Sequence, residues 1–172
     1  MSASDSPLVL VLGGARSGKS RFALDRAAAL GPPRVFVATG EARDDEMALR
    51  IARHRAERPS EWRTIEEPRR IVEVVGEAAS GVLLIDCLTL WLANVMEARG
   101  ATAAAAIDEL VAALDTRRAA VVAVSNEVGL GIVPENAVAR EFRDLAGTMN
   151  QRIAAIATEL QLLVAGQPLR IK

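Results

Sequence analysis

Largely apolar runs alternate with segments of helical periodicity along this chain. The runs at 8–12, 34–39, 82–86 and 119–124 predict buried strands, and a shorter strand is expected at 62–65. Apolar residues spaced three or four apart predict helices at 20–30, 44–58, 68–79, 89–98, 103–114 and 135–158. Two short runs on either side of 166–168 predict a closing hairpin. This alternation predicts an α/β fold with a mainly parallel sheet and helices on both faces.

The length of 172 residues fits a single domain spanning 1–172, in which the polar segment 1–7 is expected to fray. Neither a linker nor an internal repeat interrupts the pattern. One hydrophobic core therefore suffices for folding.

A glycine-rich motif, GGARSGKS, follows the first apolar run directly. It fits the phosphate-binding template G-x-x-x-x-G-K-[ST] and comprises Gly13, Gly14, Ala15, Arg16, Ser17, Gly18, Lys19 and Ser20. A strand, a glycine turn and a helix in this order aim backbone N–H groups and the positive helix end at one point, where polyphosphate binds. Lys19 would reach the β- and γ-phosphates, and the Ser20 hydroxyl would reach Mg²⁺. We therefore predict a P-loop NTPase of the RecA-like, three-layer type.

Polar residues stand at the carboxyl ends of the other predicted strands. Thr39, Asp86 and Ser125 occupy these positions, and such ends meet in one crevice of a parallel sheet. Asp86 closes a nearly all-apolar strand, as a Walker B carboxylate does, and would complete the Mg²⁺ site with Ser20. A solvated aspartate at a strand end is the alternative interpretation.

The charge balance argues against nucleic acid as the main partner, because 21 basic and 22 acidic residues give a net charge of -1. Aromatic residues make up only 3%, which leaves few platforms for base stacking. With one cysteine, no apolar run near 18 residues and no leader pattern before the first strand, we expect a cytoplasmic protein without a membrane segment.

His54 is the single histidine and lies among several arginines. A neutral imidazole is a good nucleophile toward phosphorus, and flanking guanidiniums would lower its pKa and bind the attacked phosphate. The residue pattern alone is more typical of a surface histidine near a helix carboxyl end, where the helix dipole favours it.

The segment 125–151 carries unusual chemistry for a loop and helix start. Arg140, Arg143 and Asp144 fall on one helical face, and Gly147 extends that face. An intrahelical charge network explains the same spacing.

Four segments together resemble the bifunctional adenosylcobinamide kinase/adenosylcobinamide-phosphate guanylyltransferases of cobalamin biosynthesis. They are GGARSGKSRFA at 13–23, ATGEARDDEMALRIARHRAERPSEWRTIEEP at 38–68, LLIDCLTLWLAN at 83–94 and NEVGLGIVPENAVAREFRDLAGTMNQRIA at 126–154. The last segment is more specific than the phosphate loop, which many unrelated proteins share. Members of the family often have Glu where this chain has Asp86.

This resemblance implies two reactions: phosphorylation of adenosylcobinamide, with GTP or ATP as substrates, and transfer of GMP from GTP to the product with release of pyrophosphate. It assigns the guanylylated residue to His54, with Lys19 as the second catalytic residue. It also implies a homo-oligomer, a trimer by family resemblance. The nucleotide contacts that it implies are 13–20, Ala38, Thr39, Gly40, Arg55, Ala56, Glu57, Arg58, Glu66 or Glu67, and Asp86.

Two other functions fit the phosphate loop. A kinase of a small metabolite would leave His54 without a catalytic role. A nucleotide-dependent regulator or assembly NTPase would have no acceptor substrate. A switch GTPase is disfavoured because the guanine-reading N-K-x-D segment is missing.

Overall fold

One seven-stranded sheet organises the computed structural model, which describes residues 5–56, 59–99 and 102–172, apart from the side chains at positions 50, 54 and 99. The strand order is β3-β2-β4-β5-β1-β6-β7, and only β7 runs antiparallel to its neighbour. The strands are β1 (Leu8–Gly13), β2 (Arg34–Ala38), β3 (Arg63–Glu66), β4 (Val82–Asp86), β5 (Ala120–Asn126), β6 (Glu159–Val164) and β7 (Gln167–Arg170). The predicted parallel sheet is confirmed.

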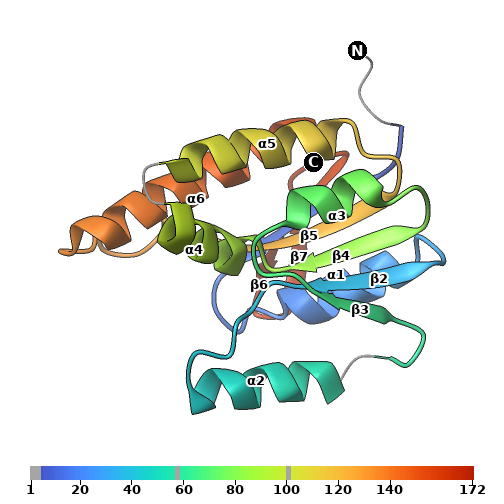
Figure 1. Cartoon of the computed structure of the whole chain (residues 1–172), viewed down its shortest axis with the longest axis horizontal. Helices are drawn as coiled ribbons and strands as arrows, with labels where there is room; N and C mark the ends of the chain where they lie inside the picture. The colour runs from blue at the N-terminus through green and yellow to red at the C-terminus, as the bar shows by residue number, and fades with distance from the viewer. Residues whose placement is uncertain (1–4, 57–58, 100–101) are drawn as a thin grey trace.

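Helices cover both faces of the sheet (Figure 1). They are α1 (Lys19–Ala28), α2 (Asp45–Ala56), α3 (Ile71–Glu77), α4 (Leu88–Arg99), α5 (Ala103–Asp115) and α6 (Ala137–Ile156). The larger core cluster packs α3, α4, α5 and α6 against one face, and the smaller one packs α1 against the other. This arrangement confirms the predicted three-layer α/β fold.

The sheet core is almost fully aliphatic because both faces are buried. All five residues of β5 at 120–124 are buried, and their side chains alternate between the two clusters. Helix α2 differs from the rest, since none of its described side chains belongs to either cluster. Figure 1 shows it apart from the other helices, beyond the edge that β3 forms.

Two local expectations differ from the structure. Ser125 and Asn126 belong to β5 rather than to a capping turn, because each pairs with β1 in parallel register. The closing hairpin turns at Ala165 and Gly166, whose φ angles are 50° and 80°, and Pro168 lies within β7. Pro168 is tolerated there because β7 is an edge strand.

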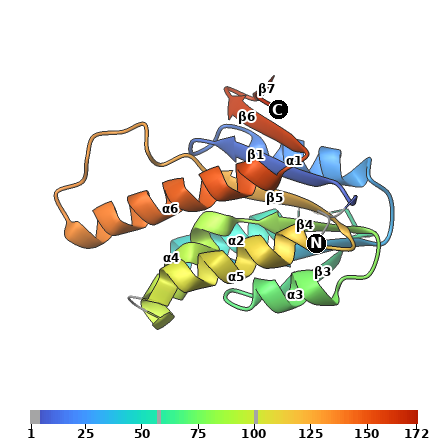
Figure 2. The ribbon, with the colours of Figure 1, turned by 90° about the horizontal axis from the view of Figure 1, so that it is seen from above.

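The turn of this hairpin packs against the phosphate loop. The Gly166 backbone N–H donates to the Ser17 carbonyl at 2.9 Å. A Cβ added to Gly18 would lie only 3.1 Å from Gly166 Cα. The hairpin therefore supports the loop that follows β1, although it lies far from it in sequence (Figure 2).

The described part of the segment that we expected to fray forms several contacts. The Ser6 hydroxyl donates to the Arg118 carbonyl at 2.6 Å, and the Pro7 carbonyl accepts from Val121 N–H at 2.9 Å. Residues 1–4 lie outside the described residues. Across the described chain, no helix combines the length and apolar character that a membrane span requires.

Candidate functional site

The phosphate loop joins the end of β1 to the start of α1, as its motif predicts. Arg16 and Gly18 have φ angles of 55° and 91°, which produce the left-handed turn of the loop. The Lys19 side chain is buried, and its Nζ donates to the Gly14 carbonyl at 2.8 Å. The ammonium group is thus held against the loop, at the end of the helix where the backbone N–H groups have no intrahelical partner.

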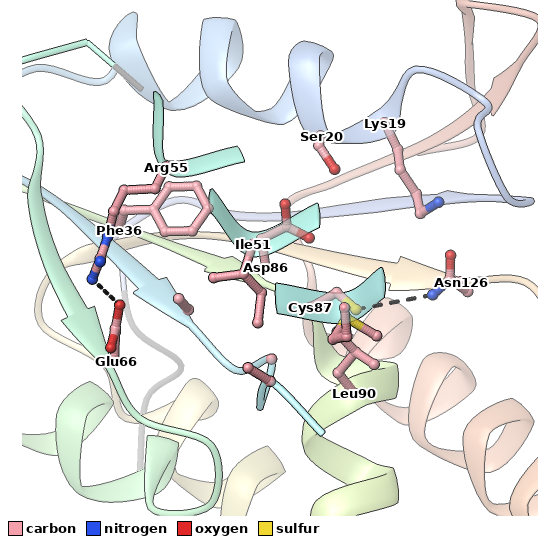
Figure 3. Close-up of a pocket in the computed structure, with 14 residues that line it drawn as sticks. Lys19, Ser20, Phe36, Ile51, Arg55, Glu66, Asp86, Cys87, Leu90 and Asn126 are labelled. Carbon is pink, nitrogen blue, oxygen red and sulfur yellow. Dashed lines mark hydrogen bonds and ion pairs between the residues drawn. The ribbon is translucent and has the colours of Figure 1, made fainter. Parts of the chain in front are cut away.

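A cavity of about 270 Å³ opens beside this loop, at the carboxyl ends of the strands (Figure 3). Seven residues that we predicted for the site line it: Lys19, Ser20, Ala38, Gly40, Arg55, Glu66 and Asp86. Residues 13–18 do not line the cavity, but they directly precede Lys19, which does. Segments from α1, β2, α2, β3 and β4 therefore meet at one pocket.

Ser20 and Asp86 provide oxygen ligands from two sides of this pocket. Ser20 lies in the first turn of α1, and Asp86 ends β4; both side chains point into the cavity in Figure 3. Among the described residues, no group of three or more His, Cys, Asp and Glu side chains could hold a metal. This donor set fits Mg²⁺, which takes one or two protein oxygens and completes its shell with phosphates and water.

Thr39 has a positioning role in the structure. Its side chain is fully buried, and its hydroxyl both donates to the Cys87 carbonyl and accepts from Cys87 N–H, at 2.8 Å each. The Thr39 N–H donates to the Asp86 carbonyl at 3.3 Å. These bonds fix the backbone that carries the Asp86 carboxylate.

Glu66 and Glu67, which sequence alone does not separate, have different surroundings. Glu66 lines the pocket and forms an ion pair with Arg55. Glu67 instead accepts from the N–H groups of Arg69 and Arg70, at 3.0 and 2.9 Å. Burial alone would raise the pKa of Glu67, but these bonds and the Arg70 charge outweigh it, so its pKa is lowered. Glu67 thus belongs to the start of α3 rather than to the pocket.

Helix α2 carries the predicted nucleophile. His54 belongs to its last turns, and its neighbour Arg55 lines the pocket. The His54 side chain lies outside what the structure describes, as do Glu57 and Arg58; Ala56 ends the helix and does not line the cavity. The helix therefore borders this pocket along most of its length, through Met47, Ile51 and Arg55.

The structure adds pocket residues that we did not predict: Phe36, Ala42, Met47, Ile51, Cys87, Leu90 and Asn126. The Asn126 amide donates to the Thr89 hydroxyl at 2.5 Å. The sequence could have indicated Asn126 as a pocket residue. It falls on the same side of β5 as Val122 and Val124, and these valines face α1.

Burial, with the Asp86 charge, raises the pKa of the Cys87 thiol, so this thiol is poorly suited as a nucleophile.

The segment at 125–151 forms contacts other than the intrahelical network that we considered. The Arg143 guanidinium donates to the Gly129 carbonyl at 2.6 Å, and the Arg140 guanidinium donates to the Glu135 carbonyl at 2.6 Å. These bonds link the loop between β5 and α6 to the helix.

A family model supports the resemblance carried by these motifs. The model described as cobinamide kinase / cobinamide phosphate guanyltransferase matches residues 9–171. The chain belongs to this family. Among curated members, the bifunctional adenosylcobalamin biosynthesis protein CobU of Salmonella typhimurium is 43% identical over 183 residues, covering 96% of this chain and 99% of CobU. CobP of Pseudomonas aeruginosa, which has the same description, is 44% identical over 169 residues, covering 95% and 96%.

Solved structures place this family member among P-loop NTPases by fold. The P4 protein of bacteriophage phi6, in complex with ADP, is similar with a TM-score of 0.52 and 16% identity, covering 95% of this chain. The chain spans 54% of that protein's length. The flagellar accessory protein FlaH of Methanocaldococcus jannaschii gives a TM-score of 0.53 at 15% identity, covering 96% of this chain and 78% of FlaH. This likeness confirms the RecA-like fold.

Proposed function

We propose that this chain phosphorylates adenosylcobinamide and then transfers GMP from GTP to the resulting phosphate through a guanylylated His54. The observation that carries this proposal is one pocket that unites Lys19, Ser20 and Asp86 with Arg55, the neighbour of His54. Family membership names both reactions, and the curated relatives are described as bifunctional. We also propose that the enzyme acts in the cytoplasm, as the sequence pattern predicts, and that it forms a homo-oligomer, which rests on the family resemblance alone.

In the kinase reaction, the phosphate loop holds the nucleotide and Lys19 neutralises charge on the transferred phosphoryl group. Mg²⁺, held by Ser20 and Asp86, would supply further charge neutralisation there. The substrate hydroxyl attacks the γ-phosphorus, the bond from that phosphorus to the β–γ bridging oxygen breaks to release the nucleoside diphosphate, and the hydroxyl proton passes to solvent. Positioning and charge account for most of the catalysis in such reactions.

In the transfer reaction, the neutral His54 imidazole attacks the α-phosphorus of GTP. A P–N bond forms, the bond to the α–β bridging oxygen breaks, and pyrophosphate leaves with stabilisation from Lys19 and the N–H groups of α1. A phosphate oxygen of adenosylcobinamide phosphate then attacks the same phosphorus. The P–N bond breaks and the imidazole is regenerated, which yields adenosylcobinamide-GDP.

Covalent labelling tests this proposal directly. The purified chain is incubated with Mg²⁺ and GTP carrying label at either the α- or the γ-phosphate, and acid-labile, alkali-stable protein label is measured. We expect label from the α-position on the wild type and none on His54→Ala. His54→Ala should retain phosphorylation of adenosylcobinamide, while Lys19→Ala should lose both reactions. Nucleotide binding without any α-label on the wild type would reject the transfer mechanism and leave a kinase.

A further inference from the structure

A second cavity lies one helix away from the nucleotide pocket, between α4 and α6. It measures about 850 Å³ and is lined by Ala93, Met96 and Glu97 of α4 and by the first turns of α6, including Val138, Glu141 and Phe142. Most of these side chains are apolar, and Val138 is 66% exposed. We refer to this cavity as the α4–α6 groove.

The groove and the nucleotide pocket share one face of α4. Leu90 lines the pocket and Glu97 lines the groove. They are seven positions apart, which is about two helical turns, so they lie on the same face about 10 Å apart along the axis. An extended ligand on this face can therefore reach both cavities.

Arg43 connects the walls of the two cavities. Its neighbour Ala42 lines the nucleotide pocket, whereas its guanidinium forms an ion pair with Glu97 at 2.5 Å. The same guanidinium donates to the Asn94 side-chain oxygen at 2.9 Å. A single half-exposed arginine therefore stands between groove and pocket.

The charged residues that line the groove are both acidic, Glu97 and Glu141. Arg43 balances the charge of Glu97, and Glu141 leaves a net negative wall, which disfavours a second nucleotide and favours a ligand that is cationic or rich in N–H donors. Adenosylcobinamide has both properties. It carries a net positive charge, because the cobalt(III) charge exceeds the summed negative charges of the corrin ring and the adenosyl ligand. Primary amides, which donate N–H groups, surround its apolar macrocycle. Its reacting hydroxyl ends a flexible arm, so the ring must rest outside the pocket that holds the nucleotide.

We infer that the α4–α6 groove binds the edge of the corrin ring while the aminopropanol arm passes Arg43 into the nucleotide pocket. This inference rests on the proposed function and names the site of its acceptor. Glu97 and Glu141 accept hydrogen bonds from the peripheral amides, and Met96, Val138 and Phe142 contact the apolar part of the ring.

The test compares Val138→Lys and Glu141→Lys with the control Leu169→Lys, which alters a similarly exposed apolar residue on β7. Equilibrium dialysis of adenosylcobinamide against the full chain, in the dark, measures binding through corrin absorbance. We expect both groove variants to weaken binding and to raise KM for adenosylcobinamide about tenfold or more, because an added cation opposes the ligand charge. Their labelling by GTP at the α-phosphate, which needs no corrinoid, should match that of the wild type, and Leu169→Lys should behave as the wild type throughout.

Three results would overturn the inference. Unchanged affinity and KM in both groove variants would place the ring elsewhere while leaving the proposed function intact. Weaker binding together with a smaller oligomer by light scattering would make the groove a contact between copies of the chain. A wild type that neither binds nor phosphorylates adenosylcobinamide would reject this inference and the proposed acceptor together.

Discussion

Arg55 of α2 and Glu66 of β3 form an ion pair on the wall of the nucleotide pocket, which links the helix that carries His54 to the edge of the sheet. Their side chains are 61% and 57% exposed, so the pair stabilises the fold by less than about 1 kcal/mol. A nucleotide can therefore replace either partner without much loss of stability. We expect Glu66 to accept hydrogen bonds from the nucleotide when it enters.

Replacing Glu66 by Gln should weaken GTP binding about tenfold, because a charged acceptor is lost. The free energy of unfolding should change by less than about 0.5 kcal/mol. Glu67→Gln is the matched control: it should lower stability by about 1 kcal/mol, because Glu67 accepts two N–H groups at the start of α3, and leave GTP affinity unchanged. Calorimetric titration and urea unfolding measure both effects. If Glu67→Gln lost more GTP affinity than Glu66→Gln, Glu67 rather than Glu66 would be the nucleotide contact.

Asp86→Asn should raise the Mg²⁺ concentration for half-maximal activity about tenfold, because a neutral amide is a weaker ligand for a hard cation. Asp86→Glu should recover part of the loss, since it restores the charge. Asp25→Asn, on the exposed face of α1, is the control and should leave the Mg²⁺ titration unchanged. An Asp86→Asn enzyme with the wild-type Mg²⁺ dependence would remove Asp86 from the metal site.

Acid should selectively weaken the contact between Arg26 and Glu159. The Arg26 guanidinium donates to the Glu159 carboxylate at 2.7 and 3.0 Å, and this bonding lowers the pKa of Glu159 in spite of its partial burial. A lowered pKa gives stability that is present above the ordinary glutamate pKa of about 4.3 and is lost as pH falls through the lower folded value.

We therefore expect Glu159→Gln to be about 1 kcal/mol less stable than the wild type at pH 7. The difference should shrink steadily below about pH 4.3. Urea unfolding of both proteins between pH 7 and pH 3 measures it. A difference that stays constant with pH would show that the carboxylate charge does not contribute.

Gly18 and Gly166 should respond differently to alanine. Both have positive φ angles, of 91° and 80°, so Ala strains the backbone at either position by about 1 kcal/mol. A Cβ on Gly18 also approaches Gly166 Cα within 3.1 Å, whereas a Cβ on Gly166 has no neighbour within 4 Å among the described atoms. Gly18→Ala should therefore be the less stable variant and lose nucleotide binding, while Gly166→Ala keeps it. Equal stabilities in thermal unfolding would contradict the packing argument.

The fold was largely predictable because both sheet faces are buried, so the strands read as apolar runs and Asp86 stands out where one of them ends. The choice between Glu66 and Glu67 was not predictable, since it depends on strand register: Glu66 pairs with Ala38, which also lines the pocket. The hairpin turn was misplaced because Ala165 adopts the positive φ that Asn or Gly usually supplies.

The α4–α6 groove was beyond sequence reasoning for a different reason. Met96 and Phe142 both fit the ordinary apolar face of an amphipathic helix, and both pack against the core. Whether two such faces close completely or leave a cavity depends on where the helices cross. Sequence periodicity carries no information on that long-range geometry.

The contact between Ser17 and Gly166 has a consequence for how the protein matures in the cell. A nascent chain presents β1 and its phosphate loop early, but the strand and turn that brace this loop are synthesised much later. Until residues 159–170 have left the ribosome, the loop lacks its neighbour in the sheet and the backbone bond to Ser17. We therefore expect the nascent chain to bind nucleotide only after these residues emerge. Nucleotide binding would then indicate that synthesis has proceeded through β7.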